Sequence, residues 1–169
     1  MITILQAEDG HQPVIHDLFR EYLDWVCPIL QREYEVNFDP AAFLEHDLAN
    51  LQIFWPPSGR LLLALEAGAA AGCACVRTIG PGLAEIKRMY VRPAFRRRGI
   101  GRALVDACIR EMRAAGYVSL RLDSARFMTD AHALYHAAGF HDIGPYPQSE
   151  IPQPFQVHWV FMERPLVRG

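Results

Sequence analysis

Residues 83–102 constrain the fold more than any other segment, because an apolar strand candidate leads there into an arginine-rich loop that contains two glycines. The loop reads Val91-Arg92-Pro93-Ala94-Phe95-Arg96-Arg97-Arg98-Gly99-Ile100-Gly101-Arg102. Gly99 and Gly101 leave room for a ligand at the backbone, and the first turn of the following helix has unpaired N–H groups. The N–H groups, the helix dipole and the guanidinium groups together favour an anion. A turn flanked by solvated arginines is the alternative interpretation.

The rest of the chain divides into helix and strand candidates of ordinary length. Apolar side chains recur at helical spacing from Val14 to Val26, and Asp39 followed by Pro40 is typical of a helix start. We expect helices over 14–26, 40–48, 101–115 and 130–138, strands over 2–6, 60–66, 71–79, 83–91, 118–122, 140–143 and 156–162, and loops over 27–38 and 144–154. This order predicts a mixed α/β (α+β) fold in which helices flank a mostly antiparallel central sheet.

Length and charge narrow the range of functions. The 169 residues, with 17 basic and 19 acidic side chains and a net charge of −2, predict a single domain over 1–169 and argue against binding nucleic acid by bulk charge. Between Glu85 and Arg102, however, seven basic residues accompany one acidic residue, so this segment is positive and the remainder negative. The longest apolar stretches are too short to span a bilayer, and the amino-terminal segment lacks the pattern of a secretory signal. We therefore expect a cytoplasmic protein that does not bind membranes.

Cysteine and histidine spacings do not predict a metal site. The four cysteines lack CxxC or disulfide-framework spacing, and we interpret them as buried thiols: Cys27, Cys73, Cys75 and Cys108. His132 and His136 have the i, i+4 spacing that can bind zinc, but there is neither an HExxH motif nor an obvious third ligand. A surface helix face is the favoured interpretation of this pair.

Other phosphate-binding loops do not fit the glycine-containing segment. A Walker loop requires Lys followed by Ser or Thr after its last glycine, and a Rossmann fingerprint requires a third glycine at fixed spacing. Neither pattern is present in the sequence. The expected ligand is therefore a pyrophosphate group held mainly by one loop.

Two strings in the sequence resemble the GNAT superfamily, the N-acetyltransferases that use acetyl-coenzyme A (acetyl-CoA). The first string, Arg96-Arg97-Arg98-Gly99-Ile100-Gly101, is similar to the pattern (Q/R)-x-x-G-x-(G/A). The second is Leu120-Arg121-Leu122-Asp123 followed by Ala131-His132-Ala133-Leu134-Tyr135-His136-Ala137-Ala138-Gly139-Phe140, and it is similar to the segment A-x-x-L-Y-x-x-x-G-F. The resemblance covers roughly residues 60–143. It implies a GNAT fold and transfer of an acetyl group from acetyl-CoA to the primary amine of a small molecule, an amino acid or a peptide.

The resemblance also implies where the coenzyme binds. The backbone of Met89 and Val91 would contact the pantetheine arm, and N–H groups from Arg97 through Arg102 would hold the pyrophosphate. The residues implied in coenzyme binding are Met89, Val91, Arg96, Arg97, Arg98, Gly99, Ile100, Gly101 and Arg102. Met128 stands where many relatives carry Asn, so that contact is not carried over.

Acetyl transfer to an amine needs a base for the amine and an acid for the departing thiolate. The resemblance implies Tyr135 as the acid and Glu85 as the base, the latter as in the histone acetyltransferase branch. Tyr135 could instead pack on a helix face, Glu85 could pair with Lys87 or Arg88, and an ordered water could act as the base. Simple strand alternation places Glu85, Lys87, Met89 and Val91 on one face, although a bulge would shift that register.

Two further functions remain open alternatives. The chain could be a non-catalytic regulatory module that binds acyl-CoA, or it could bind nucleic acid through its arginines. The presence of both Glu85 and Tyr135 favours the enzyme, and the negative charge outside the loop disfavours nucleic acid. The expected partner is an amine substrate, and the sequence leaves a homodimer open.

Overall fold

The computed structural model describes residues 1–167. Its strands are β1 (Ile2–Gln6), β2 (Gly59–Glu66), β3 (Ala69–Gly80), β4 (Leu83–Val91), β5 (Ser119–Ala125), β6 (His141–Ile143) and β7 (Trp159–Pro165), and its α-helices are α1 (Gln12–Tyr34), α2 (Pro40–Ala49), α3 (Ile100–Ala114) and α4 (Thr129–Ala137). Within these residues the strands form one sheet in the order β1-β2-β3-β4-β5-β7-β6. Neighbouring strands are antiparallel except β4 and β5, which are parallel.

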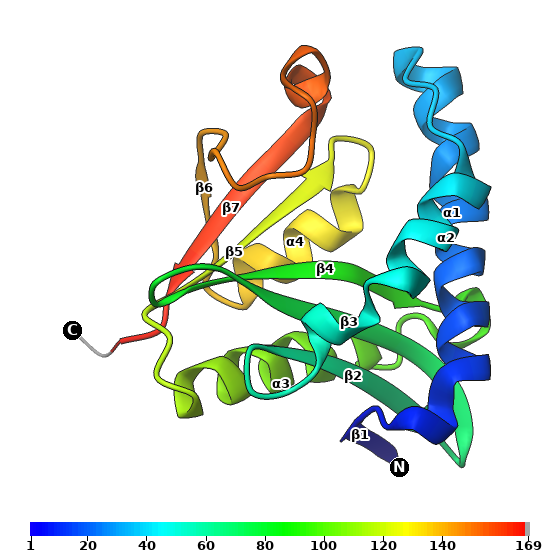
Figure 1. The fold of residues 1–169 in the computed structure, drawn as a ribbon, viewed down its shortest axis with the longest axis vertical. Coiled ribbons are helices and arrows are strands. Elements are labelled where there is room, and N and C mark those ends of the chain that lie inside the picture. The colour runs from blue at the N-terminus through cyan, green and yellow to red at the C-terminus, as the bar shows by residue number, and fades with distance from the viewer. Residues whose placement is uncertain (168–169) are drawn as a thin grey trace.

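Helices cover both faces of this sheet (Figure 1). One core cluster joins α3 and α4 to one face, and two clusters join α1 to the other. Helix α3 is amphipathic because its buried residues recur at helical spacing, among them Leu104, Cys108 and Met112. Helix α2 begins as the sequence predicts, with the Asp39 carboxylate accepting a hydrogen bond from the Ala41 N–H at 3.0 Å. The predicted mixed α/β fold with a mostly antiparallel sheet is confirmed.

Helix α1 is longer than the sequence pattern predicts. The expected loop over 27–38 is wrong for residues 27–34, which continue the helix through Pro28. Proline removes one backbone hydrogen bond, but the apolar stripe continues with the buried Cys27 and Leu30, and this burial outweighs the loss. The helix ends at Tyr34, and the next residue, Glu35, has a left-handed φ of 57° and donates its N–H to the Gln31 carbonyl at 3.0 Å.

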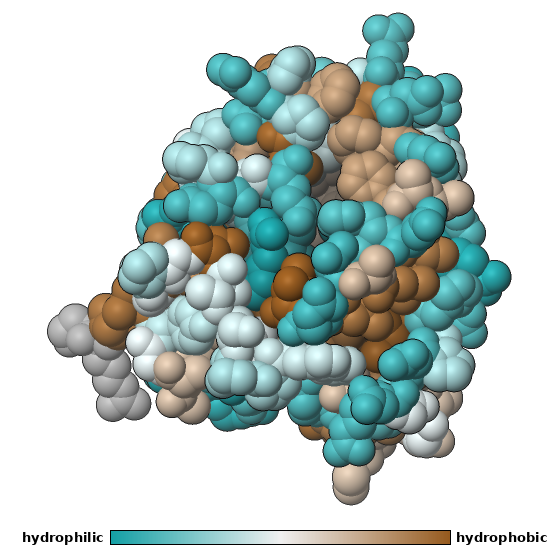
Figure 2. Space-filling view, viewed as in Figure 1, coloured by the Kyte–Doolittle hydropathy of each residue, from teal (hydrophilic) through white to brown (hydrophobic). Residues whose placement is uncertain are grey.

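The last strand begins later than predicted, at Trp159 instead of residue 156, because a 3₁₀ helix occupies Gln153–His158. All four cysteines are buried free thiols, as expected. No helix within residues 1–167 combines the length and apolarity needed to cross a bilayer. On the face seen in Figure 2, hydrophilic residues cover most of the surface and apolar residues form several separate patches.

Candidate active site

Strands β4 and β5 pair over only part of their length. Their parallel register runs from Leu83 opposite Ser119 to Ile86 opposite Leu122. Beyond this point the strands diverge (Figure 1), and the rest of β5 pairs with β7 alone. Two hollows lie at the divergence. One is a groove beside the loop that precedes α3, and the other is a cavity beside α1 and α2.

A bulge in β4 decides which side chains face each hollow. Between Lys87 and Tyr90, β4 has one residue more than β3, and Arg88 at the bulge has a φ of 50°. Lys87 lies on the cavity wall only, whereas Met89 packs against the core formed with α3 and α4 and lines both hollows. Simple alternation, which would place Glu85 and Met89 on one face, is therefore wrong beyond Lys87.

The groove has a volume of about 390 Å³ and follows the end of β4. The Arg92 N–H donates to the Ala71 carbonyl of β3 at 2.9 Å. Because backbone groups alternate between the two edges of a strand, those of Met89 and Val91 face the divergent edge instead. The side chains lining the groove come from β4, the loop, α4 and α1, and include Trp25, Met89, Val91, Arg97, Leu134 and Tyr135.

Backbone N–H groups gather where the loop enters α3. Arg97 and Gly99 have left-handed φ values of 61° and 83°. The first hydrogen bond of the helix is donated by Ala103 to the Gly99 carbonyl at 3.0 Å, so the N–H groups of residues 100–102 precede the helical ladder. The Ile100 side chain is buried in the core, which leaves only its backbone for a ligand. This concave set of donors fits an anion.

The four loop arginines separate into two groups. Arg98 and Arg102 form ion pairs with carboxylates at 2.7 and 2.9 Å, and neither lines the groove. Arg96 and Arg97 do line it. The Arg96 Nε donates to the Val91 carbonyl at 2.9 Å, and its guanidinium lies 5.2 Å from the centre of an indole ring of α1. No carboxylate within residues 1–167 pairs with Arg97, so its charge is available to the groove.

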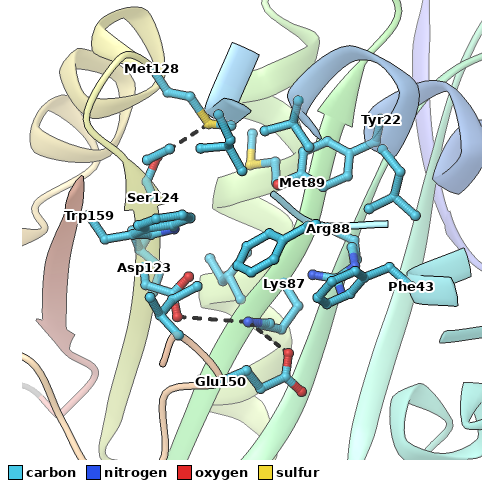
Figure 3. Close-up of a pocket in the computed structure, with 18 of the residues that line it drawn as sticks. Tyr22, Phe43, Lys87, Arg88, Met89, Asp123, Ser124, Met128, Glu150 and Trp159 are labelled. Carbon is cyan, nitrogen blue, oxygen red and sulfur yellow. Dashed lines mark hydrogen bonds and ion pairs between the residues drawn. The ribbon is translucent and has the colours of Figure 1, made fainter. Parts of the chain in front are cut away.

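The cavity has a volume of about 150 Å³ and lies on the α1 side of the divergence. Apolar and aromatic side chains form most of its wall, among them Tyr22, Leu23, Val26, Phe38, Phe43 and Trp159. Figure 3 shows three charged groups meeting at one end, where Lys87 lies between Asp123 and Glu150. Burial acts to lower the pKa of Lys87, but the neighbouring carboxylates outweigh it and raise that pKa, so Lys87 is charged.

Tyr135 lies where the groove and the cavity meet. Its hydroxyl donates to the Met89 sulfur at 3.6 Å, and only 7% of the residue is exposed. Tyr135, Met89 and Met128 each line both hollows. Burial raises the pKa of Tyr135 above its ordinary value, so the phenol is protonated at neutral pH. A group in the groove and a group in the cavity would therefore meet beside a phenolic proton.

Glu85 lies in a different environment from the one expected of a base that contacts the amine. It is fully buried and is not part of the cavity wall. One carboxylate oxygen accepts from the Arg77 Nε at 2.9 Å and the other from the Tyr146 hydroxyl at 2.6 Å, while the Lys87 Nζ lies 3.8 Å away. The carboxylates on the cavity wall are instead those of Asp123 and Glu150.

Asp123 belongs to the second motif string but was given no role there, although one signal points to it. It is a lone acidic residue directly after the predicted strand 118–122, and in the structure it lies within β5, just past Leu122, the last residue of β5 that pairs with β4. The two α4 histidines are separated: His132 bonds the Ser124 hydroxyl at 3.1 Å and His136 bonds Asp142 at 2.7 Å. Within residues 1–167, no group of three or more His, Cys, Asp or Glu residues is arranged to hold a metal ion.

Comparisons with known proteins agree on one family. The family described as "Acetyltransferase (GNAT) family" matches residues 22–140. The chain is 38% identical over 121 residues to a protein named IAA acetyltransferase from Azospirillum brasilense, which covers 70% of this chain and 76% of that protein.

Two solved structures have a similar fold. One is a GNAT-family acetyltransferase from Staphylococcus aureus, with a TM-score of 0.76 and 20% identity, covering 99% of this chain and 100% of that one. The other is the PaiA N-acetyltransferase from Thermoplasma acidophilum in complex with coenzyme A, with a TM-score of 0.73 and 17% identity, covering 98% of this chain and 99% of that one.

Proposed function

Because this chain belongs to the acetyltransferase (GNAT) family, we propose that it is an N-acetyltransferase that moves the acetyl group of acetyl-CoA to a primary amine. The amine would belong to a small molecule, an amino acid or a peptide. The observation that carries the proposal is the meeting of two hollows at Tyr135, with Met89 and Met128 on both walls. One substrate can bind in the groove through its pyrophosphate and the other in the cavity, so that their reacting groups lie together where the two hollows meet.

The groove contains the groups that acetyl-CoA requires. The N–H groups at residues 97–102 and the Arg97 guanidinium would hold the pyrophosphate. The open edge of β4 would bind the pantetheine arm through backbone groups of Met89 and Val91, although the Val91 carbonyl already accepts from Arg96. When bound, acetyl-CoA supplies the activated acetyl group and a thiolate leaving group.

The chain's own residues would handle the protons. Tyr135 would donate its phenolic proton to the thiolate, because its hydroxyl lies at the junction of the two hollows. The carboxylates of Asp123 and Glu150 would draw the amine into the cavity as an ammonium ion, and one of them would then accept its proton before the neutral amine attacks the acetyl group. Glu85 would not contact the amine itself but would hold Arg77 and Lys87 in place.

The test is release of free thiol from acetyl-CoA over a panel of amines, amino acids and short peptides, with the acetylated product identified by mass spectrometry. We expect thiol release that depends on the acceptor, together with an acetylated amine. If acetyl-CoA binds but no acceptor in the panel causes thiol release, the chain is a regulatory module instead and the proposal fails.

Arg97 and Arg98 offer a matched pair for testing the groove. Replacing Arg97 with Ala is expected to weaken acetyl-CoA binding by about 10- to 100-fold, the effect of losing a hydrogen bond to a charged group. Arg98→Ala should leave binding nearly unchanged, because the Arg98 side chain is paired with Glu66 outside the groove. Calorimetric titration of each variant with acetyl-CoA measures the difference. Equal losses in both variants would show that the loop acts only through its total charge.

A further inference from the structure

The cavity wall indicates what kind of molecule carries the amine. At about 150 Å³ the cavity is smaller than the roughly 300–1,000 Å³ of pockets that enclose drug-sized ligands. Most of its wall residues are apolar or aromatic, and Figure 3 shows Tyr22 and Phe43 on one side and Trp159 on the other. A small apolar body would therefore bury its surface there, whereas a peptide chain would leave polar amide groups without partners.

The charged end of the cavity has an excess of one negative charge. Arg88, although on the wall, is matched by Asp47, whose two oxygens accept from its Nε and Nη2 at 2.5 and 2.9 Å. The remaining connected group contains two cations and three carboxylates: Arg77 and Lys87 with Glu85, Asp123 and Glu150. A further cation entering the cavity would balance this group, and a further anion would not.

Asp123 is the least neutralised of the three carboxylates. Glu150 has two cations nearby, with the Lys87 Nζ at 3.2 Å and an Arg77 nitrogen at 3.1 Å. Asp123 has only Lys87, at 3.7 Å, which is beyond ordinary hydrogen-bond distance. The Ser149 hydroxyl donates to its Oδ2 at 3.0 Å, and within residues 1–167 no hydrogen-bond donor reaches its Oδ1.

The Asp123 side chain is only 7% exposed, yet it lies on the cavity wall at the point where β4 and β5 diverge. Its Oδ1 is not among the buried atoms that lack a hydrogen-bond partner, so this oxygen is open to the cavity and available to a donor that enters it. A primary ammonium group supplies three donors and the missing positive charge.

We propose that the acceptor is a small apolar primary amine without a carboxylate, and that Asp123 binds its ammonium group. This inference rests on the proposed N-acetyltransferase function and chooses among its three acceptor classes. A free amino acid would bring its carboxylate next to the connected charged residues of the cavity, which already have one more negative than positive charge. Both wall cations that could receive its carboxylate, Lys87 and Arg88, are already engaged.

The test compares acceptors that share one body. Phenethylamine, phenylalaninamide and phenylalanine have the same aromatic body and differ in having no further polar group, a neutral amide or a carboxylate. We expect kcat/KM for phenethylamine to exceed that for phenylalanine by at least about tenfold, because the added charge meets an unfavourable site. Phenylalaninamide should lie closer to phenethylamine, which separates the effect of charge from that of size. Isopentylamine and leucine repeat the comparison with an aliphatic body.

Asp123→Asn tests the residue itself. The variant should lose about 10- to 100-fold in kcat/KM for phenethylamine, and its preference over phenylalanine should shrink to within a few-fold. Acetyl-CoA affinity and the melting temperature confirm that it is folded. Asp142→Asn, at an exposed ion pair with His136, is the matched control and should leave the rates unchanged. If Asp123→Asn does not fold, the wild-type comparison still decides the acceptor class.

The outcomes separate the two proposals. Thiol release with amino acids preferred over their matched amines overturns this inference and leaves the N-acetyltransferase function standing. Wild-type kcat/KM for phenethylamine in folded Asp123→Asn overturns the assignment of Asp123. Acetyl-CoA binding without thiol release on any acceptor overturns the function and this inference together.

Discussion

Replacing Tyr135 with Phe is expected to lower kcat by about 10²- to 10⁴-fold, the usual contribution of a general acid, while acetyl-CoA still binds. The substitution removes only the hydroxyl, which lies 3.6 Å from the Met89 sulfur where the two hollows meet. Packing is preserved because the ring remains in the core. Steady-state rates of thiol release, measured with saturating acetyl-CoA, give kcat directly.

The pH dependence of kcat in the wild-type enzyme is a second test of the role of Tyr135 as the acid. Burial raises its pKa, so the phenol keeps its proton above the ordinary tyrosine value of about 10. The wild-type kcat should therefore not fall at about pH 10 through loss of this proton. A raised pKa does not prevent donation, because the same burial raises the pKa of the thiol that forms beside it.

Tyr117→Phe is the control, since its hydroxyl bonds Thr78 at an exposed position outside both hollows. It should leave kcat unchanged. A Tyr135→Phe variant with the wild-type kcat and pH profile would show that another group supplies the proton.

Replacing Glu85 with Gln is expected to lower the free energy of unfolding by about 3–5 kcal/mol, the usual cost of breaking a buried ion pair. Both oxygens of this fully buried carboxylate accept hydrogen bonds, from Arg77 and from Tyr146. An amide keeps one acceptor and places an NH₂ group against the second donor. It also leaves Arg77 and Lys87 with less negative charge beside them. Urea denaturation at neutral pH measures the loss.

Glu111→Gln is the matched control, because the Glu111 side chain is 39% exposed in its pair with Arg60. The loss there should be below about 1 kcal/mol. One outcome for Glu85→Gln would contradict this structural role. If the variant is as stable as the wild type but loses activity together with the acidic limb of its pH profile, Glu85 is the base after all.

Local signals in the sequence were sufficient to predict most of the architecture. The Asp39–Pro40 start of α2 and the periodic stripe of α3 each depend on a few neighbouring residues, so pattern alone locates them. The extension of α1 through Pro28 depends on burial against distant strands, which outweighs the local preference of proline. Helix propensity does not include the stabilisation from burial, because that stabilisation comes from residues distant in the sequence.

The candidate site was predicted only in part, because its motifs are local whereas its shape depends on tertiary structure. The family motif located the loop and Tyr135, which the structure brings to the groove and to its junction with the cavity. Their roles in binding and catalysis remain predictions. No glycine or proline marks the bulge at Arg88 in the sequence. Alternation alone therefore could not predict which side chains of β4 lie on which face. The separation of Glu85 from the cavity and the position of Asp123 on its wall follow from where the strands diverge, because Glu85 lies before that point and Asp123 just after it.

The bulge at Arg88 also makes the two faces of β4 separately variable. Before it, the strand presents Lys87 to the cavity, and after it the strand presents Val91 to the groove. Under the proposed function, changes at Lys87 can alter the choice of acceptor and changes at Val91 the binding of the acetyl donor, whereas Met89 lines both hollows. One inserted residue thus lets a single strand conserve one specificity while it diversifies another.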